Sequence, residues 1–401
     1  MKIAFITGCL EPGRDGVGDY TRLLAEECMR QKHQCCLIAL SDRYLQQLNT
    51  NSQETAEFML RLPANMPWEN RAKYAQQFLA KFNPDWVSLQ FVPYGYQDKG
   101  IVAEFSRWLR LIVQGRKLHV MFHELWIGEN VGAPLKEKLV GKIQRFFISR
   151  VIKNLQPAVI HTSNPAYVIM LQQLGVSAKC LPLFSNIPIS ARNADDWLLP
   201  QLRGLGLKIY PGNRDQFWLF GLFGTIHPVW SAEPLFTYLN QAAVQHDRQI
   251  IILSIGRLGY GEMLWKQISQ KYCHQFSFLQ LNEQPPSKIS EFLNSIDFGI
   301  STSPYLLVGK SGTTTAMLEH GIPVIVNRDD FKLSSNFAIH YEDPLLYRMD
   351  ANLPNVLMNQ LKRKAPCLRL RDITNNFISD LTRMNDLKPD DLPNLVTSLT
   401  T

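Results

Sequence analysis

Short apolar runs alternate along the chain with longer stretches in which apolar residues recur at helical spacing. Most of the runs are rich in β-branched residues and are bounded by turn residues. Because this alternation is typical of βα units around a parallel sheet, it predicts an α/β fold. The first half supplies five predicted strands, each followed by a helix candidate: 3–7, 34–40, 86–92, 117–122 and 158–163.

The pattern stops between residues 185 and 216, where three prolines and three glycines interrupt any sustained period. Such a stretch is the best candidate for an interdomain connection. A second series of strands then follows, and it predicts a second α/β domain: 217–226, 248–256, 276–281, 297–303 and 323–327. We therefore predict an N-terminal domain at 1–190, a linker at 191–216, a C-terminal domain at 217–370 and a helical tail at 371–401.

Length and composition agree with two globular domains. The 401 residues exceed what one hydrophobic core usually holds, and 45% of them are hydrophobic while 19% are charged. The net charge of +7 suggests an anionic ligand, but it does not choose among nucleotide diphosphates, nucleic acid and acidic lipids. Seven cysteines without a CxxC pair indicate reduced thiols and no metal site.

The ends and the apolar runs indicate a cytoplasmic protein. The N-terminus reads as a first strand leading into glycines and not as a signal peptide. The longest apolar run, 217–226, is about half the length that a membrane-spanning helix needs.

A glycine-containing loop follows the first predicted strand. Gly13, Gly16 and Gly18 precede a helix that we expect to begin near Asp19. Glycines allow close approach of backbone amides, and a helix N-terminus favours anions, so an anion or sugar site is one interpretation and a strand-to-helix turn the other. The spacing is not the GxGxxG of a dinucleotide site, although Asp42 resembles a ribose-binding acid and keeps an NAD-binding domain as an alternative.

The most informative stretch lies at 281–327. It places backbone amides, hydroxyls and one ammonium group at a predicted helix start, a combination that suits a diphosphate. Simple N-capping by serine and threonine is the alternative. The GKS tripeptide is not a P-loop, because Pro304 stands where that motif needs glycine. The candidate donor-binding residues in this stretch are Gly309, Lys310, Ser311, Gly312, Thr313 and Thr314.

This stretch resembles the donor-binding region of GT-B glycosyltransferases, particularly the family 4 group. A helix precedes an Asp-hydrophobic strand, a Ser-Pro turn, a glycine-containing loop and a helix ending in Gly-x-Pro-Val. The segment 222–228 is similar to the first strand and loop of the same donor domain, with Gly224 and Thr225 as implied contacts. The resemblance implies two Rossmann-like domains facing each other across a cleft, the GT-B architecture.

The N-terminal half carries matching segments. Residues 16–27 look like the acceptor-side glycine loop of these enzymes, 122–126 occupy the place of their strand-end histidine, and 182–188 lie like the segment before their crossover. Residues 90–97 add tyrosines and amides that suit a sugar, or else a packed loop. The implied acceptor-side residues are Gly16, Val17, Gly18, Gln90, Tyr94, Glu124 and Asn186.

The sequence departs from the family pattern at the donor side. Val308 and Ala316 stand where retaining members have two glutamates. The positions expected to bind diphosphate through basic residues fall near Thr225 and Ser231, neither of which is basic. We expect Lys310 and Arg257 to supply the cations instead, and Glu319, one turn beyond Ala316, to lie on a similar face.

Two residues are candidates for the catalytic base. Inverting enzymes of this class use an Asp or His on a first-domain loop to deprotonate the acceptor, and Asp19 and His123 occupy such positions. The structural alternatives are a helix N-cap for Asp19 and a core histidine for His123. No DxD motif follows a predicted strand, so no metal or cofactor is expected, and the nucleotide-diphosphate sugar is a co-substrate.

The segment 134–155 contains six basic residues, one acid and an apolar stripe. This pattern fits a helix lying on an acidic membrane. A helix preceding a strand must also bury apolar residues against the sheet, which favours a core helix with a basic outer face.

Together these observations predict a glycosyltransferase that moves a sugar from a nucleotide-diphosphate sugar to a sugar, lipid or small-molecule acceptor. No nucleic acid is expected as a partner, and peripheral contact with an acidic membrane remains an expectation. A noncatalytic sugar- or nucleotide-binding relative is the first alternative, because fold alone does not establish activity. An NAD-dependent oxidoreductase or epimerase is the second.

Overall fold

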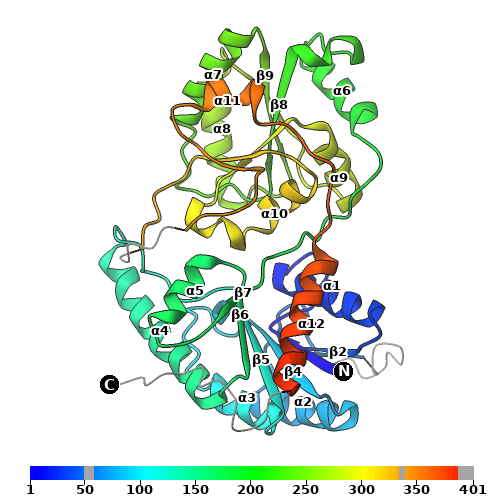
Figure 1. The fold of residues 1–401 in the computed structure, drawn as a ribbon, viewed down its shortest axis with the longest axis vertical. Coiled ribbons are helices and arrows are strands. Elements are labelled where there is room, and N and C mark those ends of the chain that lie inside the picture. Colours follow the sequence, from blue (N-terminus) through cyan, green and yellow to red (C-terminus); the bar gives the residue numbers. More distant parts are fainter. Residues whose placement is uncertain (49–57, 334–338, 387–401) are drawn as a thin grey trace. The chain divides into compact units, whose positions relative to one another are not determined.

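The computed structural model describes residues 1–48, 58–333 and 339–386. Contacts between residues divide the chain into two compact units (Figure 1). Unit 1 contains residues 1–183 and the C-terminal helix, and unit 2 contains most of residues 184–369.

Unit 1 is built on a seven-stranded sheet in the order β3-β2-β1-β4-β5-β6-β7, and every pair of neighbours is parallel. Its strands are β1 (Lys2–Thr7), β2 (Gln34–Asp42), β3 (Met59–Pro63), β4 (Trp86–Phe91), β5 (Lys117–Phe122), β6 (Val159–Thr162) and β7 (Lys179–Cys180). The connecting helices are α1 (Gly16–Arg30), α2 (Trp68–Phe82), α3 (Phe105–Val113), α4 (Leu135–Leu155) and α5 (Pro165–Gln172).

Unit 2 is built on a six-stranded parallel sheet in the order β10-β9-β8-β11-β12-β13. Its strands are β8 (Phe217–Phe223), β9 (Gln249–Ile255), β10 (Ser277–Gln280), β11 (Phe298–Ser301), β12 (Val324–Val326) and β13 (Leu346–Arg348). Its helices are α6 (Asp195–Gly204), α7 (Leu235–His246), α8 (Glu262–Lys271), α9 (Pro286–Ser295), α10 (Gly312–Glu319) and α11 (Leu353–Asn359). In both sheets the loops that follow the strands lie at the carboxyl ends of the strands, which is where parallel α/β folds bind ligands.

All ten strands predicted from the sequence are present. The prediction missed β3, β7 and β13, each of which lies at an edge of its sheet. Edge strands are paired on one side only, so these short segments need no continuous apolar run.

The segment predicted as a linker contains part of the core of unit 2. Helix α6 lies within 191–216, and its Leu198 and Leu202 are fully buried in a cluster with Phe217 and Phe292. The turn residues around α6 interrupt the βα alternation without making this segment an exposed connection.

The C-terminal helix α12 (Leu370–Asp386) packs on unit 1, where it lies beside α1 (Figure 1). Its Phe377 is fully buried, with its ring 5.9 Å from that of Phe5 and 5.1 Å from that of His119. Asn385 accepts hydrogen bonds from Trp86 Nε1 at 3.2 Å and from Lys117 Nζ at 2.8 Å. The described part of the predicted tail is therefore a helix of the first unit, and residues 387–401 lie outside the described residues.

Helix α4 does not have the simple basic outer face that the sequence favours. Ile148, Val151 and Ile152 in its second half are buried as expected. In its first half the buried positions are Gly141 and Gln144, and a Cβ on Gly141 would lie 1.8 Å from the carbonyl oxygen of Ile127. This close backbone approach leaves no room for large side chains, so the bulky apolar residues of that half face outward.

We expect Phe377→Ala to lower the free energy of unfolding by about 3–5 kcal/mol, because it empties a fully buried aromatic site where α12 meets the sheet. Urea denaturation of the full chain measures this loss. Asn376→Ala, at an exposed position of the same helix, should change the free energy by less than about 0.5 kcal/mol. Equal effects of the two substitutions would contradict the burial of α12.

Candidate functional site

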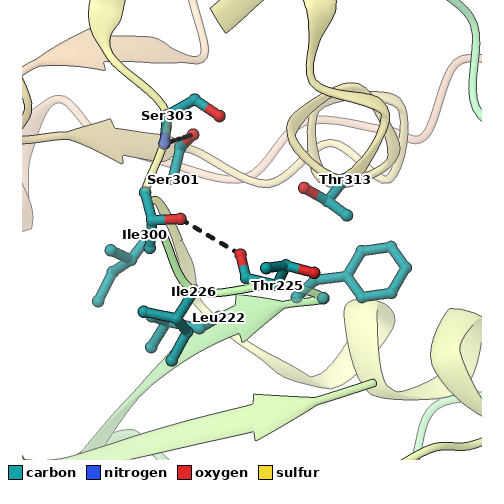
Figure 2. A pocket seen from close by; sticks show the side chains of 10 residues that line it. Leu222, Thr225, Ile226, Ile300, Ser301, Ser303 and Thr313 are labelled. Atoms are coloured by element: carbon teal, nitrogen blue, oxygen red, sulfur yellow. Dashed lines mark hydrogen bonds between the residues drawn. The ribbon is translucent and has the colours of Figure 1, made fainter. Parts of the chain in front are cut away.

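A polar pocket lies in unit 2 at the carboxyl ends of β8 and β11, beside the start of α10. Its cavity volume is about 30 Å³, and the space around it is open to solvent. Figure 2 shows the side chains of Thr225, Ser301 and Thr313 around this space. The lining residues are Leu222, Phe223, Gly224, Thr225, Ile226, Ile300, Ser301, Thr302, Ser303 and Thr313. Three residues predicted to bind the donor, Gly224, Thr225 and Thr313, are thus brought together.

The turn after β8 needs a glycine. Gly224 has a φ of +77°, and a Cβ at this position would lie 2.8 Å from Cγ2 of Thr313. A side chain would therefore strain the backbone and also push the turn away from α10. Glycine at 224 lets the backbone of the β8 turn approach the first turn of α10.

Helix α10 begins with a capping serine. Ser311 Oγ accepts a hydrogen bond from the Thr314 amide at 3.2 Å, and the Ser311 carbonyl accepts the first intrahelical bond, from Thr315. The capping interpretation of Ser311 is therefore right. The amides of Gly312 and Thr313 precede the first intrahelical donor, so the helix itself supplies them with no acceptor.

The hydroxyl of Thr314 serves the packing of the helix. Thr314 is buried, and its Oγ1 lies 2.8 Å from Ser301 Oγ and 2.9 Å from Ser311 Oγ. It therefore joins α10 to β11, and of the predicted Gly309–Thr314 set only Thr313 lines the pocket.

A cation that was not predicted from the sequence lies beside this pocket. Arg328 follows β12, is buried, and donates to the carbonyl of Thr302 at 3.1 Å while its Nε and Nη2 bind Asp330 at 2.8 and 2.7 Å. Burial, together with the charges of Arg328 and Lys310, lowers the pKa of His227, whose amide donates to Thr302 Oγ1 at 3.2 Å. The position of Arg328 directly after the last predicted strand could have indicated a cation at this site.

The other predicted donor residues lie apart from the pocket lining. Arg257 is half exposed, with Nε 3.4 Å from Glu283 Oε1. Gly309 and Lys310 end the 3-10 helix η4 (Tyr305–Lys310), where the Gly309 amide donates to the Tyr341 hydroxyl at 3.2 Å. The positive charge of Lys310 is one of the causes that lower the pKa of His227, beside the pocket.

Glu319 does not line the pocket. It stands at the far end of α10, is buried, and its Oε1 accepts the Ser185 amide at 3.2 Å. Burial raises the pKa of this carboxyl to about 7. The residue holds the 184–187 segment against α10, which the helical spacing from Ala316 did not indicate.

In unit 1 the helix after the glycine loop begins at Gly16, earlier than expected. Asp15 is its N-cap and accepts the Gly18 amide at 2.7 Å. A Cβ on Gly18 would lie 2.4 Å from the Cys9 carbonyl, so Gly18 permits the helix to pack against the loop, whereas a Cβ on Gly16 meets nothing within 4 Å. Val17 follows in the first turn, and its carbonyl accepts a hydrogen bond from Thr21.

The carboxylate of Asp19 has partners of its own. It accepts the Gly13 amide at 3.1 Å and forms an ion pair with Arg22. Asp19 is therefore not the N-cap that the structural alternative assumed, and it closes the glycine loop onto α1. Asp42, the acid that an NAD site would require, is fully buried and bound by Arg61 Nε at 2.7 Å.

His123 lies at the end of β5, beside β4 and α1. Its Nε2 is 2.9 Å from Gln90 Oε1, and its ring stacks edge to face with Tyr20 at 4.9 Å. Burial lowers the pKa of His123 to about 3, so the ring is neutral at physiological pH. Two predicted residues, His123 and Gln90, are thus in direct contact.

The remaining predicted acceptor-side residues have different surroundings. Tyr94 accepts a hydrogen bond from Gln144 of α4 at 2.9 Å, as the packed-loop interpretation expects. Glu124 is half buried, next to His123. Asn186 is exposed and belongs to unit 2, not to the first domain.

No family model matches the chain, and no curated protein matches it in sequence. In structure it is similar to HepE of Anabaena in complex with UDP and glucose, with a TM-score of 0.52, 13% identity, and coverage of 96% of this chain and 100% of that chain. HepE in complex with UDP-glucose gives a TM-score of 0.50 and 14% identity, over 96% and 98% of the two chains.

A UDP-GlcNAc 2-epimerase from Neisseria meningitidis, bound to UDP-GlcNAc, gives a TM-score of 0.48 and 10% identity, over 96% and 100% of the chains. The two parallel-sheet α/β units and the likeness to HepE confirm the prediction of two Rossmann-like domains of the GT-B fold class, while their predicted arrangement across a cleft stays a prediction. The resemblance to family 4 stays a prediction.

The described residues contain neither a metal-binding cluster nor a membrane-spanning helix. Over 1–48, 58–333 and 339–386, no group of three or more His, Cys, Asp or Glu side chains could hold a metal ion. In the same ranges, no helix has the length and apolarity needed to cross a membrane.

We expect Glu319→Gln to stabilise the protein at pH 8 and to have little effect at pH 5. The folded-state pKa of Glu319 is raised to about 7 from 4.5, so the stability of the native protein falls as pH rises between these values. The gain above pH 7 should reach about 3 kcal/mol. Thermal unfolding across this pH range measures it, with the exposed Glu26→Gln as the control. A gain that does not change with pH would contradict the raised pKa.

Proposed function

We propose that the protein is a glycosyltransferase that takes a sugar from a UDP-sugar. The observation that supports it most is the pocket where the Gly224 turn meets the first turn of α10, within a GT-B fold. The first-turn amides of Gly312 and Thr313 are donors suited to a diphosphate. The guanidinium of Arg328 lies beside the pocket but is already bound to Asp330 and to the Thr302 carbonyl. HepE, which has this fold, was solved with UDP and with UDP-glucose.

In this proposal the diphosphate of the donor is also the leaving group. As the glycosidic bond breaks, negative charge grows on the diphosphate, and oriented amides stabilise that charge more than they stabilise the bound ground state. His123 of unit 1 is the proposed acceptor of the proton of the acceptor hydroxyl. Its ring is neutral in the free protein, and burial, which lowers its pKa to about 3, makes it a weak base. Neither step uses a metal or a cofactor, and the UDP-sugar is a co-substrate.

Release of UDP from UDP-glucose by the purified protein tests the proposal. A transferase releases UDP with water as a slow acceptor, and faster when a suitable acceptor is added. The alternative of a noncatalytic relative requires that UDP bind while UDP-glucose stays intact. Stabilisation by NAD with no response to UDP would contradict both.

We expect Gly224→Val to weaken UDP binding by about 10-fold or more, because a branched side chain cannot occupy a φ of +77° against Thr313. Isothermal titration with UDP measures the change. Gly212→Ala is the matched control in the same unit, since a Cβ there meets nothing within 4 Å. Unchanged UDP affinity in Gly224→Val would place the donor site elsewhere.

We also propose that α4 rests on the surface of an acidic membrane. Four large apolar side chains of this helix follow one another at helical spacing and are exposed: Leu135 (86%), Leu139 (63%), Ile143 (38%) and Phe146 (57%). The exposed Lys142 and Arg150 lie along the same stripe, where they suit anionic headgroups. A lipid or membrane-bound acceptor would then be presented to the unit that carries His123.

We expect Leu139→Gln combined with Phe146→Gln to reduce binding to vesicles of phosphatidylcholine and phosphatidylglycerol by about 10-fold. Co-sedimentation measures it, and phosphatidylcholine vesicles alone should bind little because the basic residues lack a counter-charge. Val244→Gln, an exposed apolar residue of unit 2 (78%), is the control. Absence of binding to acidic vesicles by the native protein would rule the surface out.

A further inference from the structure

A chain of buried polar side chains crosses the sheet of unit 1 beneath α12. It begins at His123, whose Nε2 is 2.9 Å from Gln90 Oε1. Gln90 Nε2 is 2.8 Å from Ser88 Oγ, and that hydroxyl is 2.8 Å from Nδ1 of His119. His119 Nε2 is 3.1 Å from Nδ1 of His161.

The chain ends at an ion pair on α12. His161 Nε2 lies 3.0 Å from Asp380 Oδ2, and Asp380 Oδ1 binds Lys179 of β7. The other members stand on the three adjacent strands β4, β5 and β6, and every one of them is buried. So many polar groups in a hydrophobic interior cost free energy unless each has a partner, and here consecutive members satisfy one another.

The groups at both ends of this chain of side chains favour the same donor-to-acceptor direction for its hydrogen bonds. The bonds to His161 and Lys179 hold the pKa of Asp380 down to about 2, so its carboxylate only accepts hydrogen bonds and His161 Nε2 must donate. In the tautomer of His161 that carries a single proton, on Nε2, Nδ1 accepts from His119 Nε2, and His119 Nδ1 then accepts from the Ser88 hydroxyl. At the other end, the Gln90 amide donates to Ser88 and its oxygen faces His123.

We propose that this directed chain, anchored at Asp380, fixes the proton of His123 on Nε2 and leaves Nδ1 as the basic nitrogen. Among the residues that the structure describes, the hydrogen bond of the His123 ring is made by Nε2, with Gln90 Oε1. The catalytic consequence rests on the proposed function: the acceptor hydroxyl transfers its proton to Nδ1, while the Nε2–H remains bonded to Gln90. Gln90, Ser88, His119, His161 and Asp380 are positioning residues for this base.

The direction of the chain is a specific claim with an alternative. A doubly protonated His161 would donate from Nδ1, which reverses every bond as far as Gln90 and turns its amide. His123 would then carry its proton on Nδ1 and could not act as a base toward a substrate on that side. The tautomer of His123 therefore shows in which direction the hydrogen bonds between His123 and His161 are donated.

Nuclear magnetic resonance of the full chain labelled with 15N-histidine tests the proposal without any assay of activity. Single His→Gln substitutions at 119, 123 and 161 assign the signals. We expect all three rings to be neutral, with the proton on Nε2. A proton on Nδ1 of His123 would overturn the proposal even if the protein transfers sugar.

Ser88→Ala interrupts the chain without touching His123. We expect a mixture of His123 tautomers and a fall in kcat of up to about 100-fold for UDP release from UDP-glucose, with KM for UDP-glucose unchanged. Asp380→Ala should act in the same direction. Asn385→Ala is the matched control, because Asn385 holds α12 through Trp86 and Lys117 outside the chain.

The outcomes separate the proposals. An equal loss of kcat in Asn385→Ala and Ser88→Ala, or an unchanged His123 tautomer in Ser88→Ala, would overturn the proposal. The hydrogen-bonded side chains would then serve only the stability of the fold. The expected tautomers in a protein that never releases UDP would support the directed chain and overturn the proposed function instead.

Discussion

The close approach of the Gly224 turn to α10 is the constraint on which the unit 2 site depends. Strand β8 is central in its sheet, so its end is held by β9 on one side and β11 on the other. The turn that follows it reaches α10 because residue 224 has no side chain, and the cap at Ser311 fixes where the helix starts. Rigid strands and one permitted backbone angle thus bring the first turn of α10 next to the space that Thr225 lines.

Unit 1 uses a different means to hold its candidate base. His123 lies at a strand end, but its orientation is set by neighbours on β4, and theirs by a helix that comes from the other end of the sequence. Asp380 is 219 residues from His161, yet their side chains are hydrogen-bonded. The final helix therefore contributes to the environment of the base as well as to the core, where Phe377 contacts Phe5 and His119.

Much of this fold could be predicted from the sequence, because central parallel strands are buried on both faces and must be continuously apolar. The edge strands β3, β7 and β13 escape that rule. The docking of α12 on unit 1 could not be predicted either, since an amphipathic helix shows which face it buries but not which surface covers that face. Helix α6 could not be predicted either, because it is short and turn residues flank it on both sides.

Candidate site residues whose place depends on backbone geometry could be predicted from the sequence. Those whose place depends on the direction of a long side chain could be predicted less well. Gly224 and Thr225 were implied by the resemblance of residues 222–228 to a donor domain and Thr313 by the predicted helix start, and the structure brings the three together. Arg257 was predicted as a cation of the site and Arg328 was not considered. The sequence does not reveal that Arg328 turns toward Thr302, whereas Arg257 lies 3.4 Å from Glu283.

Helix α4 illustrates how one small residue decides what a helix presents to its surroundings. Gly141 brings the helix backbone onto the carbonyl of Ile127, and Gln144 uses its amide to hold Tyr94 and the amide of Ile127. Two buried positions are thereby used for a close approach and for polar bonds, so the apolar residues at 135, 139, 143 and 146 have no core to enter. The loop between His123 and α4 is fixed by the same contacts. The packing that exposes the apolar stripe is therefore also the packing that holds the Ile127 backbone, in the loop between His123 and α4.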